Sequence, residues 1–215
     1  DSKWLVPHFE KMLYDNALLI LSLCDAYSIT GEDRYRQVIE ETIAFAEREL
    51  KEPTGGYYSA LDADSEGEEG KFYTFTREEW LEIFGGENPV VAGYFGVTPE
   101  GNWEGVNILH VPTGIARVAA QYGLDEAAVG EQVAAAKKQL FAYREKRIRP
   151  ATDDKSLLSW NALMNLALTR AAAVLKNDQY KKRASDHMTW MLQHFYINNT
   201  LMHTWKNAPA RIGAN

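Results

Sequence analysis

The chain has 215 residues, of which 46% are hydrophobic and 25% charged, a balance typical of globular rather than disordered proteins. Its net charge of −7 and the lack of a basic stripe argue against nucleic acid as a partner. The single cysteine, Cys24, excludes an internal disulfide framework, and no apolar run reaches the ~18 residues that a membrane span needs. The sequence shows no signal-peptide pattern, so we expect a cytoplasmic protein with no membrane partner.

Helical periods dominate the N-terminal part of the chain. They predict a helix from about Pro7 to Ile29 that is apolar nearly all round, is therefore buried, and ends at Gly31. A second helix, from about Asp33 to Leu50, has a single apolar face.

A less regular region follows these two helices. Residues 56–60 and 71–75 predict a short strand pair around an acidic loop, and Thr76 with Glu79 forms a capping-box pattern that opens a short helix. Further helices are expected at 89–96, about 113–122 and about 125–147, with a turn-rich loop at 99–107. No low-complexity linker divides the chain, so we expect one domain over residues 1–215.

The N-terminal helix pair recurs near the C-terminus at an offset of 145 residues. Asn16-Ala17-Leu18 matches Asn161-Ala162-Leu163, and positions 16–35 share 8 identities with positions 161–180. Each copy consists of a buried helix, a short turn and a helix with one apolar face. Stacked units of this kind form an αα solenoid or toroid, so we expect a mainly α fold.

Hairpin topology predicts where the polar segments meet. In an antiparallel helix pair, the start of the first helix and the end of the second lie at the same end. The start of the first helix, the 56–75 strand pair, residues 153–155 and residues 199–206 should therefore gather at one concave end of the array. Such an end is the default hypothesis for a binding site.

The first of these segments carries His8, Lys11 and Asp15, which fall within ~60° on one side of the expected helix, whereas Glu10 faces away from His8. A histidine near a helix start is an acid/base candidate, because the helix dipole there disfavours imidazolium. The alternatives are a structural histidine and a solvated Lys11–Asp15 ion pair.

The loop at 62–69 contains five acidic residues in eight positions. It is similar to the first half of a calcium loop, but Tyr73 stands where the bidentate glutamate belongs, so we expect no metal. We also expect no cofactor, since the chain carries no Gly-rich phosphate loop. The loop is either solvated or directs Asp62 and Asp64 into the concave end, where paired carboxylates could bind sugar hydroxyls or act as acid and base.

The turn-rich loop places the indole of Trp103 beside Glu104 and Asn107. An aromatic face with nearby polar acceptors suits a sugar ring, and the alternative is an indole that fills a gap in the core. The connector before the second buried helix alternates cations and anions at Arg149, Asp153, Asp154 and Lys155. It is either a salt-bridged connector or a clamp for an anion or a hydroxyl.

Four segments resemble motifs of the YyaL-like proteins, whose animal relatives are called spermatogenesis-associated proteins with a thioredoxin-like domain. These segments are Trp4–Ala17, Gly56–Gly67, Gly101–Gly105, and Arg149–Lys155 followed by Ser159–Met164. They stand in the family's order and span nearly the whole chain, which makes the resemblance specific.

The resemblance implies a thioredoxin-like domain, absent from this chain, followed by an (α/α)6 toroid similar to N-acylglucosamine 2-epimerase. This chain would be roughly the first half of that toroid, with small β-hairpin insertions. Its first residue, Asp1, is not a methionine and no closing element precedes Asn215, which also suggests a fragment. A fragment of this kind should expose apolar surface, so dimerisation is expected.

We therefore expect a domain that binds or modifies carbohydrate, by analogy with sugar epimerases, isomerases or glycoside hydrolases. The acid/base candidates are His8, Asp62, Asp64 and Glu104. The candidates for substrate binding are Lys11, Asp15, Trp103, Asn107, Arg149, Asp153, Asp154 and Lys155. The alternative is a non-catalytic toroid that binds a protein partner together with the thioredoxin-like domain.

Overall fold

The computed structural model describes residues 2–208, which fall into two compact units. Unit 1 comprises the residues up to Phe9 together with Ala63–Pro150, and unit 2 comprises Glu10–Asp62 together with the residues from Ala151 onward. Asp1 and Asn215, the two ends used in the sequence analysis, lie outside the described residues.

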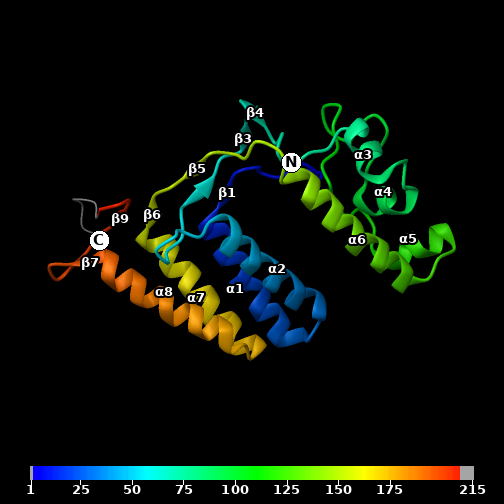
Figure 1. Ribbon diagram of the computed structural model, residues 1–215. Helices are drawn as coiled ribbons and strands as arrows, with labels where there is room; N and C mark the ends of the chain where they lie inside the picture. Colours follow the sequence, from blue (N-terminus) through cyan, green and yellow to red (C-terminus); the bar gives the residue numbers. More distant parts are fainter. Residues whose placement is uncertain (1, 209–215) are drawn as a thin grey trace. The chain divides into compact units, whose positions relative to one another are not determined.

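Unit 2 is built from two helix hairpins, which confirms the predicted repeat and the mainly α fold of antiparallel hairpins (Figure 1). The four helices are α1 (Leu13–Thr30), α2 (Asp33–Glu49), α7 (Leu158–Leu175) and α8 (Asp178–Phe195). Both α1 and α7 have 18 residues, and they begin 145 positions apart (158 − 13 = 145). The sequence repeat is thus also a repeat of helix boundaries.

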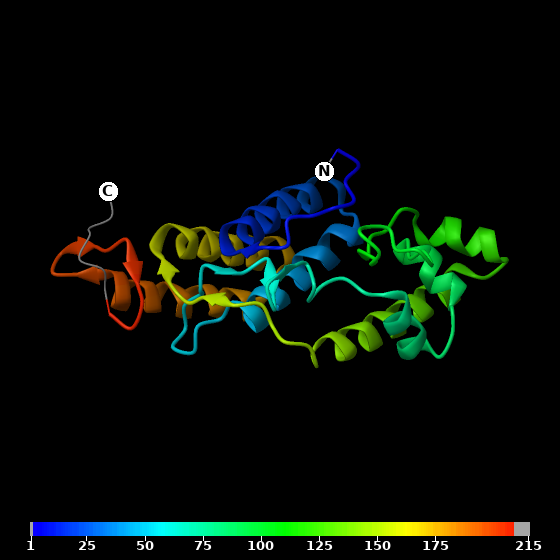
Figure 2. The same cartoon turned by 90° about the horizontal axis from the view of Figure 1, so that it is seen from above.

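The two hairpins share one apolar core. α1 lies against α7, and each packs on its own partner, so that α1 and α7 form an inner layer while α2 and α8 form an outer layer (Figure 2). The core is made mainly of aliphatic side chains, among them Leu13, Ile20, Ile39, Ile43, Met164 and Leu168. α1 is covered on one side by α2 and on another by α7, but Leu18, Leu19 and Ile29 are exposed, so the helix is less buried than its apolar sequence predicts.

Short strands extend the repeat to the start of the inner helices. β1 (Lys11–Met12) leads directly into α1, and β6 (Ser156–Leu157) leads into α7 at the same offset of 145 residues. β1 pairs with β2 (Ala60–Leu61), which also pairs with β5 (Thr152–Asp153), while β6 pairs with β9 (Thr204–Trp205). Strand pairing therefore gathers the four segments that hairpin topology brings together, and this part of the prediction is confirmed within unit 2.

Two predicted elements are wrong. The first helix begins at Leu13 rather than at Pro7, because Lys11 and Met12 are extended and pair with β2. Residues 56–60 do not pair with residues 71–75, since Ala60 bonds with β1 and β5 instead. The acidic loop forms a hairpin of its own from β3 (Asp64–Ser65) and β4 (Glu68–Glu69).

Unit 1 packs four helices around a second core of buried side chains, among them Trp80, Val91, Val118, Val133 and Leu140. The helices are α3 (Arg77–Phe84), α4 (Pro89–Phe95), α5 (Ile115–Tyr122) and α6 (Glu126–Arg144). Thr76 and Glu79 form the predicted capping box at the start of α3, and the Asp125 carboxylate caps α6. These helices agree with the sequence analysis to within a few residues.

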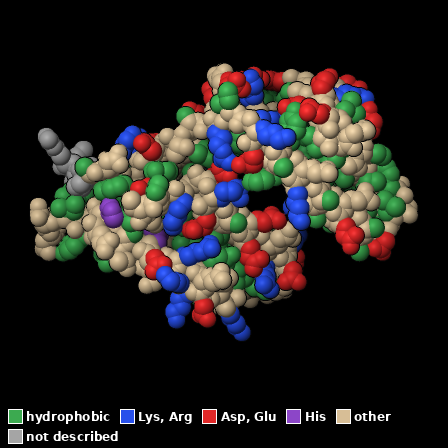
Figure 3. All heavy atoms as spheres, viewed as in Figure 1, with side chains coloured by type: hydrophobic (Ala, Val, Ile, Leu, Met, Phe, Trp, Pro, Cys, Tyr) green, Lys and Arg blue, Asp and Glu red, His purple; other side chains and the backbone are tan. Residues whose placement is uncertain are grey.

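A further strand pair, β7 (Tyr196–Ile197) with β8 (Thr200–Leu201), follows α8 in unit 2. None of the helices within residues 2–208 has the length and apolar character needed to traverse a bilayer. On the face shown in Figure 3, basic and acidic side chains are interspersed rather than gathered by sign.

Candidate functional site

A pocket of about 300 Å³ lies beside the three-stranded sheet of unit 2. It is lined by Glu10, Ala60, Asp62, Ala151, Thr152 and Asp153. Carboxylate side chains from three separate segments of the chain therefore surround one small hollow, next to the strands that precede the inner helices. This carboxylate pocket is the candidate functional site.

Strand register explains why these carboxylates meet. Lys11 lies opposite Leu61, and Ala60 lies opposite Asp153, in two antiparallel pairs that share β2. Glu10 and Asp62 each stand one residue beyond the first pair, and the backbone N–H of Asp62 donates to the carbonyl of Ala151 at 2.8 Å. The sheet thus places acidic residues of three strands around the same pocket.

Asp153 is the carboxylate whose ionisation the structure alters. Partial burial alone would raise its pKa, but hydrogen bonds from Ser59 and Lys155 outweigh burial and hold the pKa below its ordinary value. The Lys155 ammonium lies 3.2 Å from the Asp153 carboxylate. Asp153 therefore stays ionised at neutral pH and can accept hydrogen bonds from hydroxyl groups, whereas it is a poor general acid.

The remaining predicted residues of unit 2 lie around the same sheet. Asp154 forms an ion pair with Lys206 at 2.5 Å, which ties β5 to the segment after β9. Lys11 is half-buried on β1, and Asp15 is exposed in the first turn of α1. Asp62 is exposed at the pocket.

The predicted residues of unit 1 have surroundings of their own. His8 and Glu104 are exposed, and so is Asp64 on β3. Trp103 packs on buried Phe9, with ring centroids 5.4 Å apart. The argument that placed His8 near a helix start is wrong, because α1 begins five residues after it, at Leu13.

Asn107 and Arg149 have structural partners. The Asn107 side chain is buried, and its amide accepts from the backbone N–H of Thr98 and donates to the Thr98 carbonyl. Arg149 is ion-paired with Glu145. These contacts favour the structural alternatives for both residues, and their part in substrate binding stays a prediction.

The acidic hairpin of unit 1 is neutralised in part by Lys71. Its ammonium lies 3.2 Å from the carboxylate of Glu66 and 3.7 Å from that of Glu68. Within residues 2–208, no group of three His, Cys, Asp or Glu side chains is placed to hold a metal ion.

A buried polar network holds the segment that leads into β2. The Asn161 amide accepts from the backbone N–H of Tyr57 at 2.9 Å and donates to the Tyr57 carbonyl at 3.0 Å. His187 Nε2 lies 3.0 Å from Asn161 Oδ1, and His187 Nδ1 lies 3.5 Å from Asn165 Nδ2. Because an amide nitrogen can only donate, Nδ1 accepts and Nε2 carries the hydrogen, which fixes a neutral tautomer. Burial, with a smaller contribution from Lys51, lowers the pKa of His187 from 6.5 to about 3.

Sequence reasoning missed two parts of this arrangement. Glu10 was placed on the side away from His8 because its segment was expected to be helical, whereas the antiparallel register of β1 and β2 brings Glu10 to the same pocket as Asp62. His187 lies on α8, and its burial against Asn161 was not predicted. The spacing of Asn161 and Asn165, four residues apart on a mostly apolar helix, was the available signal.

Comparisons with known proteins agree with the family resemblance. The chain is 32% identical to spermatogenesis-associated protein 20 of Homo sapiens over 97% of its length, which covers 30% of that protein. It is 30% identical to the protein of the same name from Rattus norvegicus, over 91% of this chain and 28% of the relative. An uncharacterised protein of Caenorhabditis elegans is 28% identical over 85% of this chain and 28% of the relative. The predicted resemblance is therefore confirmed: the chain is a homologue of one segment of the spermatogenesis-associated proteins.

The chain spans about 30% of the length of these curated relatives. No family model matches it. Among solved structures, a crystal structure of D-mannose isomerase is similar with 15% identity and a TM-score of 0.29, over 92% of this chain and 45% of that one.

Proposed function

We propose that the carboxylate pocket of unit 2 binds a sugar. The observation that carries the proposal is the convergence of Glu10, Asp62 and Asp153 on a hollow of about 300 Å³. That volume is at the lower end of the range for small-molecule sites, which suits a single sugar ring. Carboxylates accept hydrogen bonds from adjacent hydroxyl groups, and Asp153 is held in its ionised form.

The finer proposal is that the domain modifies the bound sugar by acid/base chemistry of the epimerase, isomerase or glycosidase type. The acid/base candidates are His8, Asp62, Asp64 and Glu104, with Lys11, Asp15, Trp103, Asp154 and Lys155 as further candidates for binding. Proton abstraction beside a carbonyl calls for a base with a pKa near neutrality, and the lowered pKa of Asp153 makes its carboxylate a poor base for this step. This proposal rests on the resemblance to sugar epimerases and on the chemistry of these side chains. We propose a cytoplasmic location, since the free, buried thiol of Cys24 fits a reducing compartment.

Thermal melting of the chain against a panel of mono- and disaccharides tests binding. One sugar class should raise the melting temperature, because a ligand that binds only the folded state stabilises it. Asp62→Asn should abolish the shift, whereas Glu131→Gln, an exposed carboxylate on α6, should keep it. A shift that survives Asp62→Asn would place the sugar elsewhere, and no shift with any sugar would contradict the proposal.

Catalysis requires a separate measurement. The sugar that raises the melting temperature is incubated with the protein, and epimerisation, isomerisation and hydrolysis are followed by NMR. His8→Ala should remove turnover and preserve the melting shift. Equal turnover in wild type and His8→Ala would refute the acid/base role of His8.

A second candidate function is favoured by the ion pairs around the pocket. Asp153 pairs with Lys155, and Asp154 pairs with Lys206, so two of the predicted clamp carboxylates already have cationic partners. We propose as the alternative that the domain binds a protein partner together with the thioredoxin-like domain. Partner binding that persists in both His8→Ala and Asp62→Ala, with no sugar-dependent shift in wild type, would support this alternative.

A further inference from the structure

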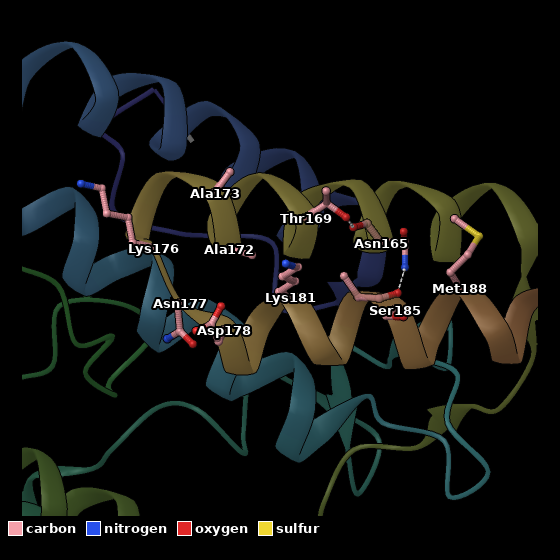
Figure 4. A pocket seen from close by; sticks show the side chains of 11 residues that line it. Asn165, Thr169, Ala172, Ala173, Lys176, Asn177, Asp178, Lys181, Ser185 and Met188 are labelled. Atoms are coloured by element: carbon pink, nitrogen blue, oxygen red, sulfur yellow. Dashed lines mark hydrogen bonds between the residues drawn. The ribbon is translucent and has the colours of Figure 1, made fainter.

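A hollow of about 430 Å³ in unit 1 is enclosed by four separate segments of the chain. They are the β3–β4 hairpin, residues 71–79 leading into α3, Val106, and residues 146–148 after α6. The groove of about 700 Å³ between α7 and α8 lies instead within one helix hairpin, and its Asn165 and Thr169 side chains donate to carbonyls of those two helices (Figure 4). Half of the residues that line the hollow in unit 1 are ionisable, and we call it the charged hollow.

Buried polar contacts fix the walls of the charged hollow. The Arg147 guanidinium donates to three backbone carbonyls within residues 71–74, at 2.7–3.1 Å, and lies 2.8 Å from the Glu79 carboxylate. The hydroxyl of Ser65, a residue that is 3% exposed, donates to the carbonyl of Ile148 at 2.6 Å. The hollow is therefore preformed, so a ligand that enters it loses little free energy to ordering of the protein.

The wall on the side of the β3–β4 hairpin offers mainly hydrogen-bond acceptors. Ser65 and Thr74 are buried, and each donates its hydroxyl hydrogen to a backbone carbonyl, so only their lone pairs remain available. The carboxylates of Glu66 and Glu68 can only accept. This wall calls for a ligand group that is rich in donors, and an ammonium group has three.

The same wall has an excess of negative charge. Glu66 and Glu68 share the ammonium of Lys71, at 3.2 and 3.7 Å, so two carboxylates face one cation. Arg147 and Glu79 balance each other within their own ion pair. The positive charge of an ammonium group would therefore complete the charge balance of the hairpin wall.

The wall after α6 has the opposite excess. Lys146 forms no ion pair with any residue in the described range 2–208, and its ammonium lies 5.9 Å from the centroid of the Tyr143 ring. Phe72 and Val106 add apolar surface to the lining. The charged hollow thus combines a wall that suits a cation, a lysine that suits an anion, and an apolar surface.

We infer that the charged hollow binds a free α-amino acid with an apolar side chain. The ammonium group of the ligand lies at the hairpin wall, where Glu68 is one of its acceptors, and the carboxylate of the ligand accepts from Lys146. The apolar side chain packs against Phe72 and Val106. The charged hollow shares no lining residue with the carboxylate pocket of unit 2, so the inference does not depend on sugar binding there.

Titration calorimetry of the 215-residue chain tests the inference with L-leucine, L-methionine and L-phenylalanine. At least one of them should bind saturably, and its affinity should fall as the salt concentration rises. Isoamylamine is leucine without the carboxylate, and isocaproate is leucine without the ammonium group. Each should bind about fivefold more weakly than leucine, because each lacks one of the two charge partners and such exposed pairs contribute modestly.

Two charge-removing variants assign the two ends of the ligand. Lys146→Gln should weaken leucine binding about fivefold and leave isoamylamine binding unchanged, because the amine has no carboxylate. Lys138→Gln, at an exposed lysine of α6 outside the hollow, is the matched control. Glu68→Gln should weaken the binding of leucine and of isoamylamine alike. Glu69→Gln, at the next residue of β4, removes the same charge outside the lining and should bind as wild type does.

NMR places the ligand, and circular dichroism establishes that each variant is folded. Amide resonances that shift with the amino acid should come from residues 65–79 and 146–148. The inference is overturned if none of the three amino acids binds saturably, or if isoamylamine or isocaproate binds as tightly as leucine. Wild-type affinity in both Lys146→Gln and Glu68→Gln would also overturn it, and so would shifts confined to the carboxylate pocket.

Discussion

At the scale of single residues, Asn161 forms more hydrogen bonds than Asn16, its counterpart in the repeat. Asn16 donates to the carbonyl of Met12, and Asn161 donates to the equivalent carbonyl of Leu157. Asn161 also bonds with both backbone polar groups of Tyr57 and with His187. The same residue type therefore closes the start of a helix in one copy and links three segments of chain in the other.

Asn161→Ala should lower the free energy of unfolding by about 2–3 kcal/mol, because it leaves the buried polar groups of Tyr57 and His187 without partners. Asn16→Ala removes one partly buried hydrogen bond and should cost about 1 kcal/mol. Urea denaturation of both variants provides the comparison. Equal losses at the two positions would show that the network around Tyr57 adds nothing to stability.

His187 gives stability a pH dependence. Its pKa is about 3 in the folded state and 6.5 as a free side chain, so between these values the unfolded chain binds more protons than the folded one. Stability should therefore fall as the pH falls from 6.5 towards 3, by up to about 1.4 kcal/mol per pH unit from this group.

His187→Gln should flatten this dependence, because glutamine offers amide hydrogen bonds without titrating. Urea denaturation at several pH values measures the slope for wild type and variant. His203→Gln, at an exposed histidine of the same unit, is the matched control and should keep the wild-type slope. A wild-type slope in His187→Gln would show that other groups account for the acid sensitivity.

At the scale of elements, the turn before β2 is fixed by its contact with α8. A Cβ on Gly56 would lie 2.2 Å from Trp190 Cη2. Trp190 is itself only 4% exposed and belongs to a small hydrophobic cluster separate from the main core of unit 2. The indole N–H of Trp190 donates to the Thr54 hydroxyl, which holds the ring over the turn. A side chain at Gly56 would therefore displace a large buried ring.

Gly56→Ala should destabilise the protein by about 1–3 kcal/mol, the usual cost of overpacking. Gly86→Ala, where a Cβ would meet nothing within 4 Å, should leave stability nearly unchanged. Thermal melting compares the two alanine variants. If Gly56→Ala and Gly86→Ala had the same melting temperature, the Trp190 ring would move aside at little cost in stability.

Helices and strands differ in how far the sequence predicts them. The 145-residue repeat, the capping box at Thr76 and Glu79, and the boundaries of α2 follow from local pattern, and the structure confirms them. The strands are two residues long and pair with partners up to about 90 positions away, so no local period marks them. Pairing with β2 also overrode the helical pattern before Leu13.

The residues of the candidate site also divide into those that sequence patterns predict and those whose roles depend on contacts between distant segments. Asp62 and Asp153 were placed together by hairpin topology, and both line the carboxylate pocket. Glu10 was excluded because a helical period was applied to a segment that is extended. The structural roles of Asn107 and of the Asn161–His187 pair depend on contacts between distant segments, which spacing alone does not reveal.

At the scale of the whole molecule, residues 63–150, the larger part of unit 1, are an insertion between two adjacent strands of unit 2. The chain leaves unit 2 after Asp62 and returns at Ala151, and these residues are joined by a backbone hydrogen bond of 2.8 Å. The insertion spans 150 − 62 = 88 residues, yet the strands on either side of it, β2 and β5, are paired with each other. Unit 2 therefore has a continuous core that is formed without residues 63–150.

Replacing residues 63–150 by Asn-Gly should leave a folded unit 2. A two-residue turn suits the antiparallel register of β2 and β5, in which Leu61 lies opposite Thr152. Circular dichroism and urea denaturation should show helix and one cooperative transition. Residues 10–62 alone are the control and should unfold without cooperativity, because α1 and α2 then lose α7. If the deletion protein unfolded without a cooperative transition, unit 2 would require residues 63–150 in order to fold.

The packing of α1 on α7 also imposes a delay on the growing chain. After α2 ends at Glu49, another 157 − 49 = 108 residues are made before α7 begins at Leu158. At about 5–20 residues per second, the ribosome takes on the order of 5–20 s to supply that interval. During that time the face of α1 and α2 that carries Ile20, Cys24, Ile39 and Ile43 has no α7 to cover it. We expect the nascent hairpin to expose an apolar surface of the kind that chaperones bind until the second half of the repeat emerges.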